Sequence, residues 1–73
     1  MRLEIWSGGQ RLSVVEATAC RDVACRAGLH IIDQIENGVT WSMILADRPR
    51  EVALTAAIQA LAERGVRATV MVE

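Results

Sequence analysis

The sequence has no lysine, phenylalanine or tyrosine, and its only large aromatic side chains are Trp6 and Trp41. The core of this 73-residue chain must therefore be built from the Val, Ile, Leu and Ala that dominate its 52% of apolar residues. A chain of this length buries only about 60% of its unfolded surface, so its own core is marginal. We expect one domain over residues 1–73 that gains stability by association.

Other absences exclude broad classes of protein. Two cysteines, Cys20 and Cys25, are too few for a disulfide scaffold and fit a reducing compartment, so we expect a cytoplasmic protein. No segment approaches the roughly 18 apolar residues of a membrane span, which predicts no membrane partner. The eight arginines and nine acidic residues are interspersed, with a net charge of −1, which predicts no nucleic-acid partner.

The N-terminal third predicts a strand and then a helix. Residues 2–6 alternate between apolar and polar, as in a half-buried strand, and residues 7–10 are flexible and polar. Ser13 and Glu16 have the spacing of a capping box, which predicts a helix to about residue 27, ended by Gly28. The expected buried stripe of this helix consists of residues four apart: Val15, Ala19, Val23 and Ala27.

The middle of the chain predicts a β-hairpin. Two β-rich runs, residues 29–35 and 39–45, flank the turn sequence Glu36-Asn37-Gly38. A two-residue loop would pair Glu36 with Val39, whereas a three-residue loop pairs Ile35 with Val39 and Asp33 with Trp41. We favour the three-residue loop because it collects seven apolar residues and a single Asp on one face. That Asp33 would bond the Trp41 indole N–H or lie in water at a sheet edge.

The C-terminal part predicts a second helix and a last strand. Asp47 is the expected cap, Pro49 would occupy the first turn, and Arg48 and Arg50 are expected in a solvated turn. The expected buried face is Leu54, Ala57, Ile58 and Leu61, and the expected exposed face is Thr55, Gln59 and Glu63. Gly65 would end the helix, and residues 66–72 alternate as a strand.

The resulting βαββαβ order is typical of the α+β, ferredoxin-like sandwich, a four-stranded antiparallel sheet with two helices on one face. An alternative ββαβαβ order starts a strand at residues 11–15 and the helix at about Thr18. In the preferred order the sheet contributes these residues to the core: Leu3, Ile5, Leu29, Ile31, Ile35, Val39, Met43, Leu45, Val66, Val70 and Val72.

The face of the sheet without helices carries four large apolar residues among polar ones: Trp6, Ile32, Ile44 and Met71. Exposed apolar patches rimmed by polar groups usually mark interfaces. We therefore expect this face to bind a second copy of the chain or a larger protein subunit.

Residues 23–35, in which a helix ends in Gly before an Ile-rich strand, and residues 60–66 resemble small regulatory ACT domains. The acidic-Pro-Gly turn of that family is absent, and Gly8 and Gly9 stand in its region. The resemblance implies an amino-acid or other small-metabolite site between this loop and the start of the next strand, formed across a subunit interface. The implied ligand-binding residues are Gly8, Gly9, Gln10, Arg11, Leu29 and His30.

Little in the sequence points to catalysis. His30 is the single histidine, and Cys20 and Cys25 lie about 140° apart around a helix, so no metal set or nucleophile–base pair is visible. We expect no enzyme activity, metal or cofactor. The leading hypothesis is a regulatory, ligand-binding homo-oligomer, and the alternative is a structural interaction module without a ligand. RNA binding ranks last, because Trp6 alone could stack with a base on the open sheet face.

Overall fold

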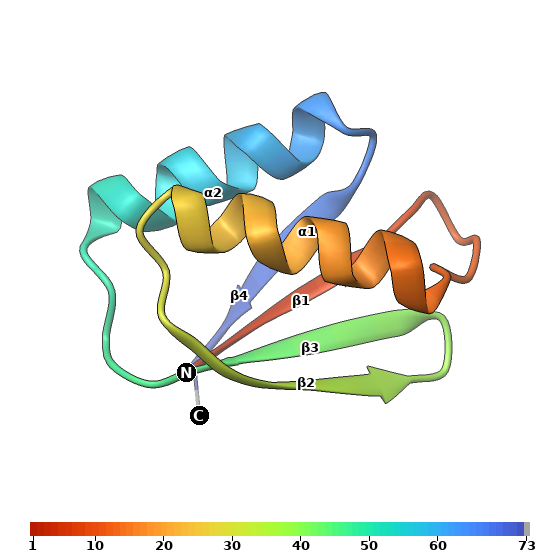
Figure 1. The fold of residues 1–73 in the computed structure, drawn as a ribbon, viewed down its shortest axis with the longest axis horizontal. Helices are drawn as coiled ribbons and strands as arrows, with labels where there is room; N and C mark the ends of the chain where they lie inside the picture. Colours follow the sequence, from red (N-terminus) through yellow and green to blue (C-terminus); the bar gives the residue numbers. More distant parts are fainter. Residues whose placement is uncertain (73) are drawn as a thin grey trace.

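The chain folds into four strands and two helices in the predicted βαββαβ order, in a computed structural model that describes residues 1–72 (Figure 1). The elements are β1 (Arg2–Trp6), α1 (Val14–Arg26), β2 (Ile31–Asn37), β3 (Thr40–Leu45), α2 (Glu51–Glu63) and β4 (Arg67–Met71). Within the described residues, neither helix has the length and apolar character needed to cross a membrane.

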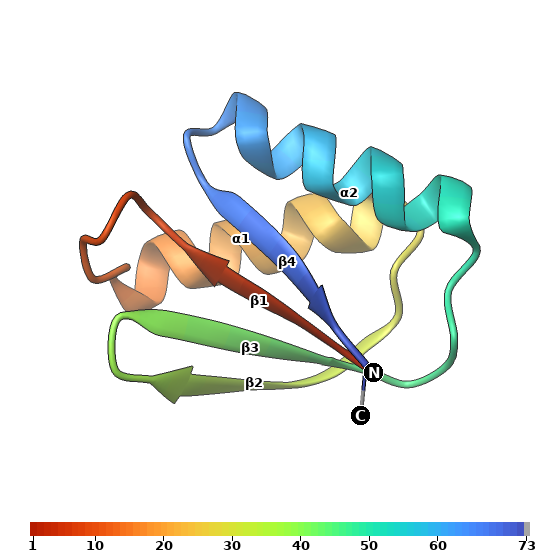
Figure 2. The same cartoon turned by 180° about the vertical axis from the view of Figure 1, so that it is seen from behind.

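The strands form one antiparallel sheet in the order β2-β3-β1-β4, and both helices lie on the same face of it (Figures 1 and 2). This arrangement confirms the ferredoxin-like fold class. The alternative strand at residues 11–15 is wrong, because α1 already begins at Val14. Ser13 caps that helix, with its Oγ accepting a hydrogen bond of 3.2 Å from the Glu16 backbone N–H.

The core lies between the sheet and the two helices. From the sheet side, the buried residues are Leu3, Ile5, Leu29, Ile31, Met43, Leu45 and Val66, as predicted, and Val70 is half-buried. The helices and the β1–α1 connection add Leu12, Ala17, Cys20, Ala24, Ala57 and Leu61. Aliphatic and small side chains therefore fill the interior, as the scarcity of aromatic residues required.

Helix α1 buries a different stripe from the one predicted. Ala17, Cys20 and Ala24 face the core, whereas Val15 is exposed and the other predicted residues, Ala19, Val23 and Ala27, are half-buried. An Ala-rich helix has several stripes of similar apolar character, so packing against the sheet and α2 selects among them.

Helix α2 buries the predicted face but begins later than predicted. Ala57 and Leu61 are buried, Leu54 and Ile58 are half-buried, and the predicted polar face is exposed. The N-cap is Arg50, with no side-chain cap bond, so the prediction of an Asp47 cap is wrong. Pro49 precedes the helix instead of lying in its first turn, since a proline keeps the residue before it extended.

The β2–β3 hairpin has neither of the two registers considered from the sequence. Asn37 pairs with Thr40, so Gly38 and Val39 form the turn. Gly38 has a φ of 64° and Val39 a negative φ, the combination of a type II′ turn with Gly in its first central position. The predicted three-residue loop is therefore wrong.

A β-bulge between Ile31 and Asp33 reverses the faces of the rest of β2. Ile31 pairs with Leu45, but Asp33 pairs with Ile44 on the open side of the sheet. One inserted residue moves every later side chain to the other face. Consequently Ile35 lies on the open face and is 47% exposed. Val39 is 49% exposed because it lies in the turn, so neither residue belongs to the core as predicted. Val72, just beyond β4, is also outside the core at 70% exposed.

Trp41 lies on the helix side of the sheet, where its indole Nε1 donates to the Leu12 carbonyl oxygen at 3.4 Å. Asp33 therefore does not bond the indole. It is exposed on the edge strand, the other predicted position, and its carboxylate accepts a 2.7 Å bond from the Gln34 N–H.

Candidate functional site

The predicted ligand-binding residues lie at two opposite ends of the molecule. Gly8 to Arg11 join β1 to α1 at the end of the sheet that carries the β2–β3 turn (Figure 1). Leu29 and His30 precede β2 at the other end, near the N-terminus. Helix α1, of 13 residues and about 20 Å, separates the two segments. A single copy of the chain does not bring them together, so a shared site requires two copies.

The Gly8–Arg11 loop offers little unpaired charge. Gln10 N–H donates to the Ser7 carbonyl oxygen at 2.7 Å, closing a tight turn, and Gly8, Gly9 and Gln10 are exposed. The Arg11 guanidinium forms an ion pair with the Glu36 carboxylate of β2. A ligand carboxylate at this loop would have to compete with Glu36 for Arg11.

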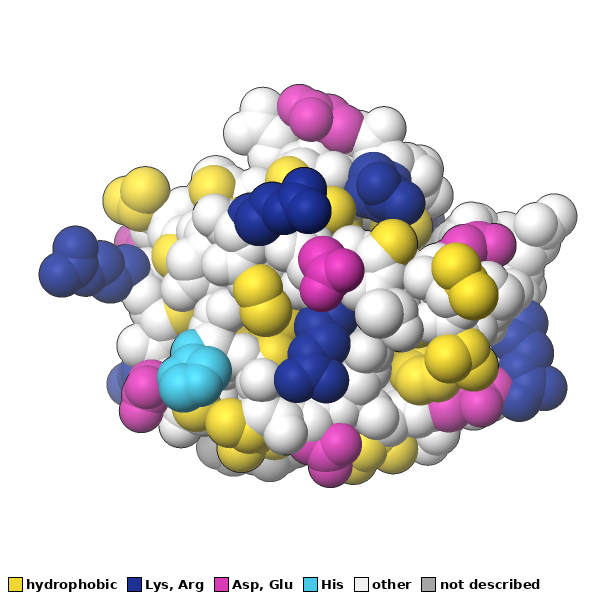
Figure 3. Space-filling model, in the orientation of Figure 1, with side chains coloured by type: hydrophobic (Ala, Val, Ile, Leu, Met, Phe, Trp, Pro, Cys, Tyr) yellow, Lys and Arg dark blue, Asp and Glu magenta, His cyan; other side chains and the backbone are white. Residues whose placement is uncertain are grey.

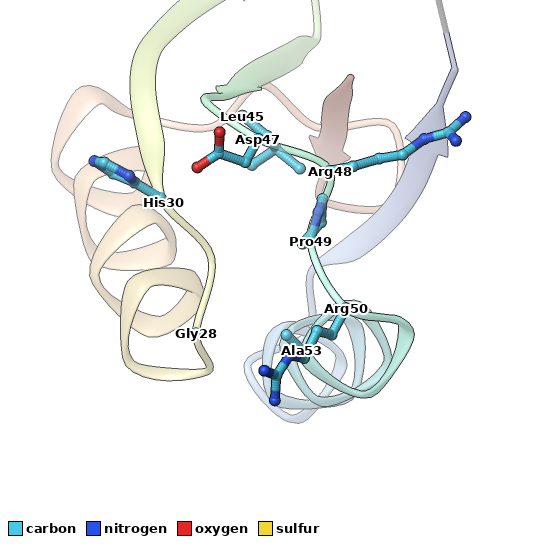
Figure 4. A pocket seen from close by; sticks show the side chains of 8 residues that line it. All are labelled: Gly28, His30, Leu45, Asp47, Arg48, Pro49, Arg50 and Ala53. Carbon is cyan, nitrogen blue, oxygen red and sulfur yellow. The ribbon is translucent and has the colours of Figure 1, made fainter.

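The other end of the molecule contains a pocket of about 360 Å³ (Figure 4). It lies between the C-terminus of α1, the β3–α2 connection and the first turn of α2. Its lining residues are Gly28, His30, Leu45, Asp47, Arg48, Pro49, Arg50 and Ala53.

Backbone contacts hold the walls of the pocket. Gly28 has a φ of 107° and lets the chain turn sharply after α1, where Leu29 N–H donates to the Ala24 carbonyl oxygen at 3.1 Å. A Cβ on Gly28 would lie 3.4 Å from the Ala53 Cβ, so the end of α1 lies close to the start of α2. Ala46 N–H donates to the His30 carbonyl oxygen at 2.9 Å, tying the two connections together.

Charged groups of both signs border this pocket. The Asp47 carboxylate is directed toward the segment that carries His30, and the Arg50 side chain lies along the first turn of α2 beside Ala53 (Figure 4). Arg48 points away, toward β4 (Figure 4). Within residues 1–72, Asp47 and Arg50 make no side-chain hydrogen bond or ion pair. Both charges are therefore available to a ligand.

Of the ligand-binding residues predicted from the sequence, His30 lines this pocket and Leu29 is buried in the core. Asp47 and Arg50 were not predicted as ligand-binding. The sequence does hold a signal for them, because three charged residues surround the single proline directly before a helix. Which of these charges line a cavity depends on how the connection packs against α1.

The open face of the sheet is a second candidate site (Figure 2). The strand register places Trp6, Ile44 and Met71 on this face, all half-buried, and the predicted Ile32 is exposed at the bulge. Ile35 joins them because of the reversed alternation. The Arg67 guanidinium lies 6.0 Å from the centre of the Trp6 ring, a cation–π distance, and covers part of this surface.

The helix-bearing face is mixed in charge, with arginine and acidic side chains interspersed among apolar ones (Figure 3). Both cysteines belong to α1. Cys25 is exposed, whereas Cys20 faces the core and is buried. Burial raises the pKa of the Cys20 thiol, and the nearby Arg64 guanidinium opposes that shift. In the described part of the chain, no three His, Cys, Asp or Glu side chains lie close enough to hold a metal ion.

Comparisons with known proteins find no relative: no family model, no curated protein and no solved structure matches this chain.

Proposed function

We propose that this chain is a small binding domain that acts as a homo-oligomer and holds an amino acid or a similar zwitterionic metabolite in the His30–Arg50 pocket. The observation that carries the proposal is a pair of opposite charges at one cavity, Asp47 and Arg50, neither of which has a pairing partner among residues 1–72. The resemblance of residues 23–35 to ACT domains supports the same class of ligand, although it implies a site at a subunit interface.

The chemistry of the lining suits a zwitterion. The planar guanidinium of Arg50 can donate two parallel hydrogen bonds to a carboxylate, and the Asp47 carboxylate can accept from an ammonium group. Leu45, Pro49 and Ala53 supply apolar contacts for a side chain. A volume of about 360 Å³ is at the lower end of the range of about 300–1,000 Å³ for small-molecule pockets.

The experiment is a thermal-melting screen with the twenty amino acids, followed by calorimetric titration of the ligands that raise the Tm. A ligand at 100 times its Kd stabilises the folded state by about 2.7 kcal/mol, which a melting curve detects. We expect Asp47→Asn and Arg50→Ala to weaken binding at least tenfold. The absence of a shift with every amino acid would contradict the proposal.

Arg11→Ala is the control that locates the site. If the pocket alone binds the ligand, Arg11→Ala leaves the affinity unchanged, because Arg11 lies at the opposite end of the molecule (Figure 1). If the loop of a second copy completes the site, as the resemblance implies, Arg11→Ala weakens binding as well.

The open sheet face favours a second candidate function, an interaction module without a ligand. This face presents a largely apolar surface that no helix within residues 1–72 covers, made up of Trp6, Ile35, Ile44 and Met71. Sedimentation of Trp6→Glu and Ile44→Glu against the unchanged chain tests this function. An unchanged mass in both variants would exclude the open face as the interface.

A further inference from the structure

The two edges of the sheet differ in how they are protected. The β2 edge has the bulge at Ile31 and Asp33, and polar side chains connect it to α1 and the preceding loop. Gln34 Nε2 donates to the Ala17 carbonyl oxygen at 3.0 Å, Arg21 Nη2 donates to the Ile31 carbonyl oxygen at 3.2 Å, and Arg11 is paired with Glu36. Bulges and charged side chains are the devices by which proteins prevent an edge strand from pairing.

Of these devices, the described part of the β4 edge has one charged side chain and no bulge. Its residues, Arg67–Met71, pair with β1 in an uninterrupted register, without proline, acid or bulge. Its one charged side chain, Arg67, extends over Trp6 on the open face. Within the described residues β4 pairs only with β1, so the outer row of its backbone N–H and C=O groups has no strand partner.

An apolar groove runs beside this edge on the helix side of the sheet. It has a volume of about 380 Å³ and lies between the C-terminal half of α2 and the start of β4. Its lining residues are Ile58, Ala62, Gly65, Val66, Arg67 and Ala68. Ile58 and Ala62 are four apart on α2, so they face the edge together.

The same edge carries an exposed apolar side chain. Val72 follows β4 and is 70% exposed. It continues the alternation that places Val66, Ala68 and Val70 on the helix side of the strand. Each copy thus has both a groove and an exposed valine at opposite ends of one edge.

We propose that β4 pairs antiparallel with β4 of a second copy, about a two-fold axis at Thr69, so that one sheet runs through both copies. In this register Val66 lies opposite Val72 of the second copy, and Ala68 lies opposite Val70. The exposed Val72 of each copy then enters the groove of the other. The inference rests on the homo-oligomer part of the proposed function and names its surface.

Electrostatics and spacing favour a second copy as the occupant. The register sets Arg67 opposite Met71, so like charges do not face each other. The two α2 helices run antiparallel, which places the positive N-terminus of each beside the negative C-terminus of the other. In each copy two helices cover four strands, so one helix spans two strands, or about 10 Å of sheet at ~4.8 Å per strand. The same spacing across the β4–β4 interface would place the two α2 helices at an ordinary helix-packing distance.

Sedimentation equilibrium of variants substituted at exposed positions tests this β4–β4 interface. We expect a dimer for the unchanged chain. Thr69→Lys places two like charges opposite each other on the two-fold axis, and Ala62→Arg places a bulky charge in the groove. Each should weaken dimerisation at least 100-fold. Ala56→Arg, on the outer face of the same helix, is the matched control and should leave the mass unchanged. A monomer at millimolar concentration, or a dimer that persists in both edge variants, would overturn the inference.

A disulfide trap tests the register. In a Cys25→Ser background, Thr69→Cys should form a covalent dimer with oxidised glutathione, because directly opposed residues have Cα atoms about 4.5–5.5 Å apart, within disulfide reach. Ile35→Cys is the control, and cross-linking of Ile35→Cys without Thr69→Cys would contradict β4 pairing. A monomer that still binds an amino acid refutes this dimer alone, whereas a cross-linked dimer that binds none refutes only the ligand.

Discussion

Gln34 of the edge strand β2 donates a hydrogen bond from Nε2 to the backbone carbonyl oxygen of Ala17 in α1, at 3.0 Å. A polar side chain therefore lies on the side of β2 that faces the helices, where the sequence predicted an apolar one. The bond links the edge strand to the helix above it. It stabilises the register in which Gln34, and not Asp33, lies on the helix side of the sheet.

Gln34→Ala should lower the free energy of unfolding by about 1 kcal/mol, because the substitution removes one side-chain hydrogen bond in a half-buried position. Urea denaturation at neutral pH measures the change. Gln59→Ala, at an exposed position on α2, is the control and should change stability by less than about 0.5 kcal/mol. Equal effects of the two substitutions would show that the Gln34 bond contributes nothing.

Ser42→Ala should raise the free energy of unfolding, by up to about 1 kcal/mol. The Ser42 side chain is 1% exposed, and within residues 1–72 its Oγ has no hydrogen-bond partner, so its desolvation is uncompensated. Ser13→Ala makes the same chemical change but should lower the free energy of unfolding. It removes the cap of α1 and should cost about 1 kcal/mol. A denaturant midpoint above that of the unchanged chain for Ser42→Ala, and below it for Ser13→Ala, would confirm both predictions.

The two cysteines should differ sharply in reactivity. Cys25 is exposed, whereas Cys20 is buried and its raised pKa keeps the thiol protonated. We expect a thiol reagent to label one cysteine of the native protein quickly and the second only as the chain unfolds. Mass spectrometry after brief labelling identifies the site, and rapid labelling of Cys20 in the Cys25→Ser chain would contradict the prediction.

Stability should fall in alkaline solution because of Cys20. Burial raises its folded-state pKa above the ordinary value of 9.0, so the folded state holds the proton more tightly than the unfolded state. The free energy of unfolding is unaffected below that ordinary value and declines as pH rises toward the folded-state pKa, by at most about 1.4 kcal/mol per pH unit.

The composition makes this titration easy to isolate. The chain has no lysine or tyrosine, so no side-chain ammonium or phenol titrates in the same range as the Cys20 thiol. Denaturation measured from pH 8 to pH 10.5 should show the decline in the unchanged chain and in Cys25→Ser, and a flat profile in Cys20→Ala. A decline of the same slope in Cys20→Ala would assign the effect to another group.

Local signals in the sequence determined the order of the elements and most of their ends. Ser13 caps α1, Gly28 follows its C-terminus with a positive φ, and the alternation of β1 places Leu3 and Ile5 in the core. The exposed and buried faces of α2 also followed from spacing, because its large Leu and Ile side chains define one stripe. These features depend on residues within a few positions of one another, so the sequence alone carries them.

Only the tertiary structure decided the register of β2 and the residues of the pocket. One inserted residue at the bulge exchanges the faces of Asp33 and Gln34. Whether that exchange is favourable depends on α1, which accepts the Gln34 bond from a distant part of the chain. In the same way, Asp47 and Arg50 border a cavity because the end of α1 packs against the start of α2. Contacts between segments far apart in the chain set both features, so the local pattern of residues cannot decide them.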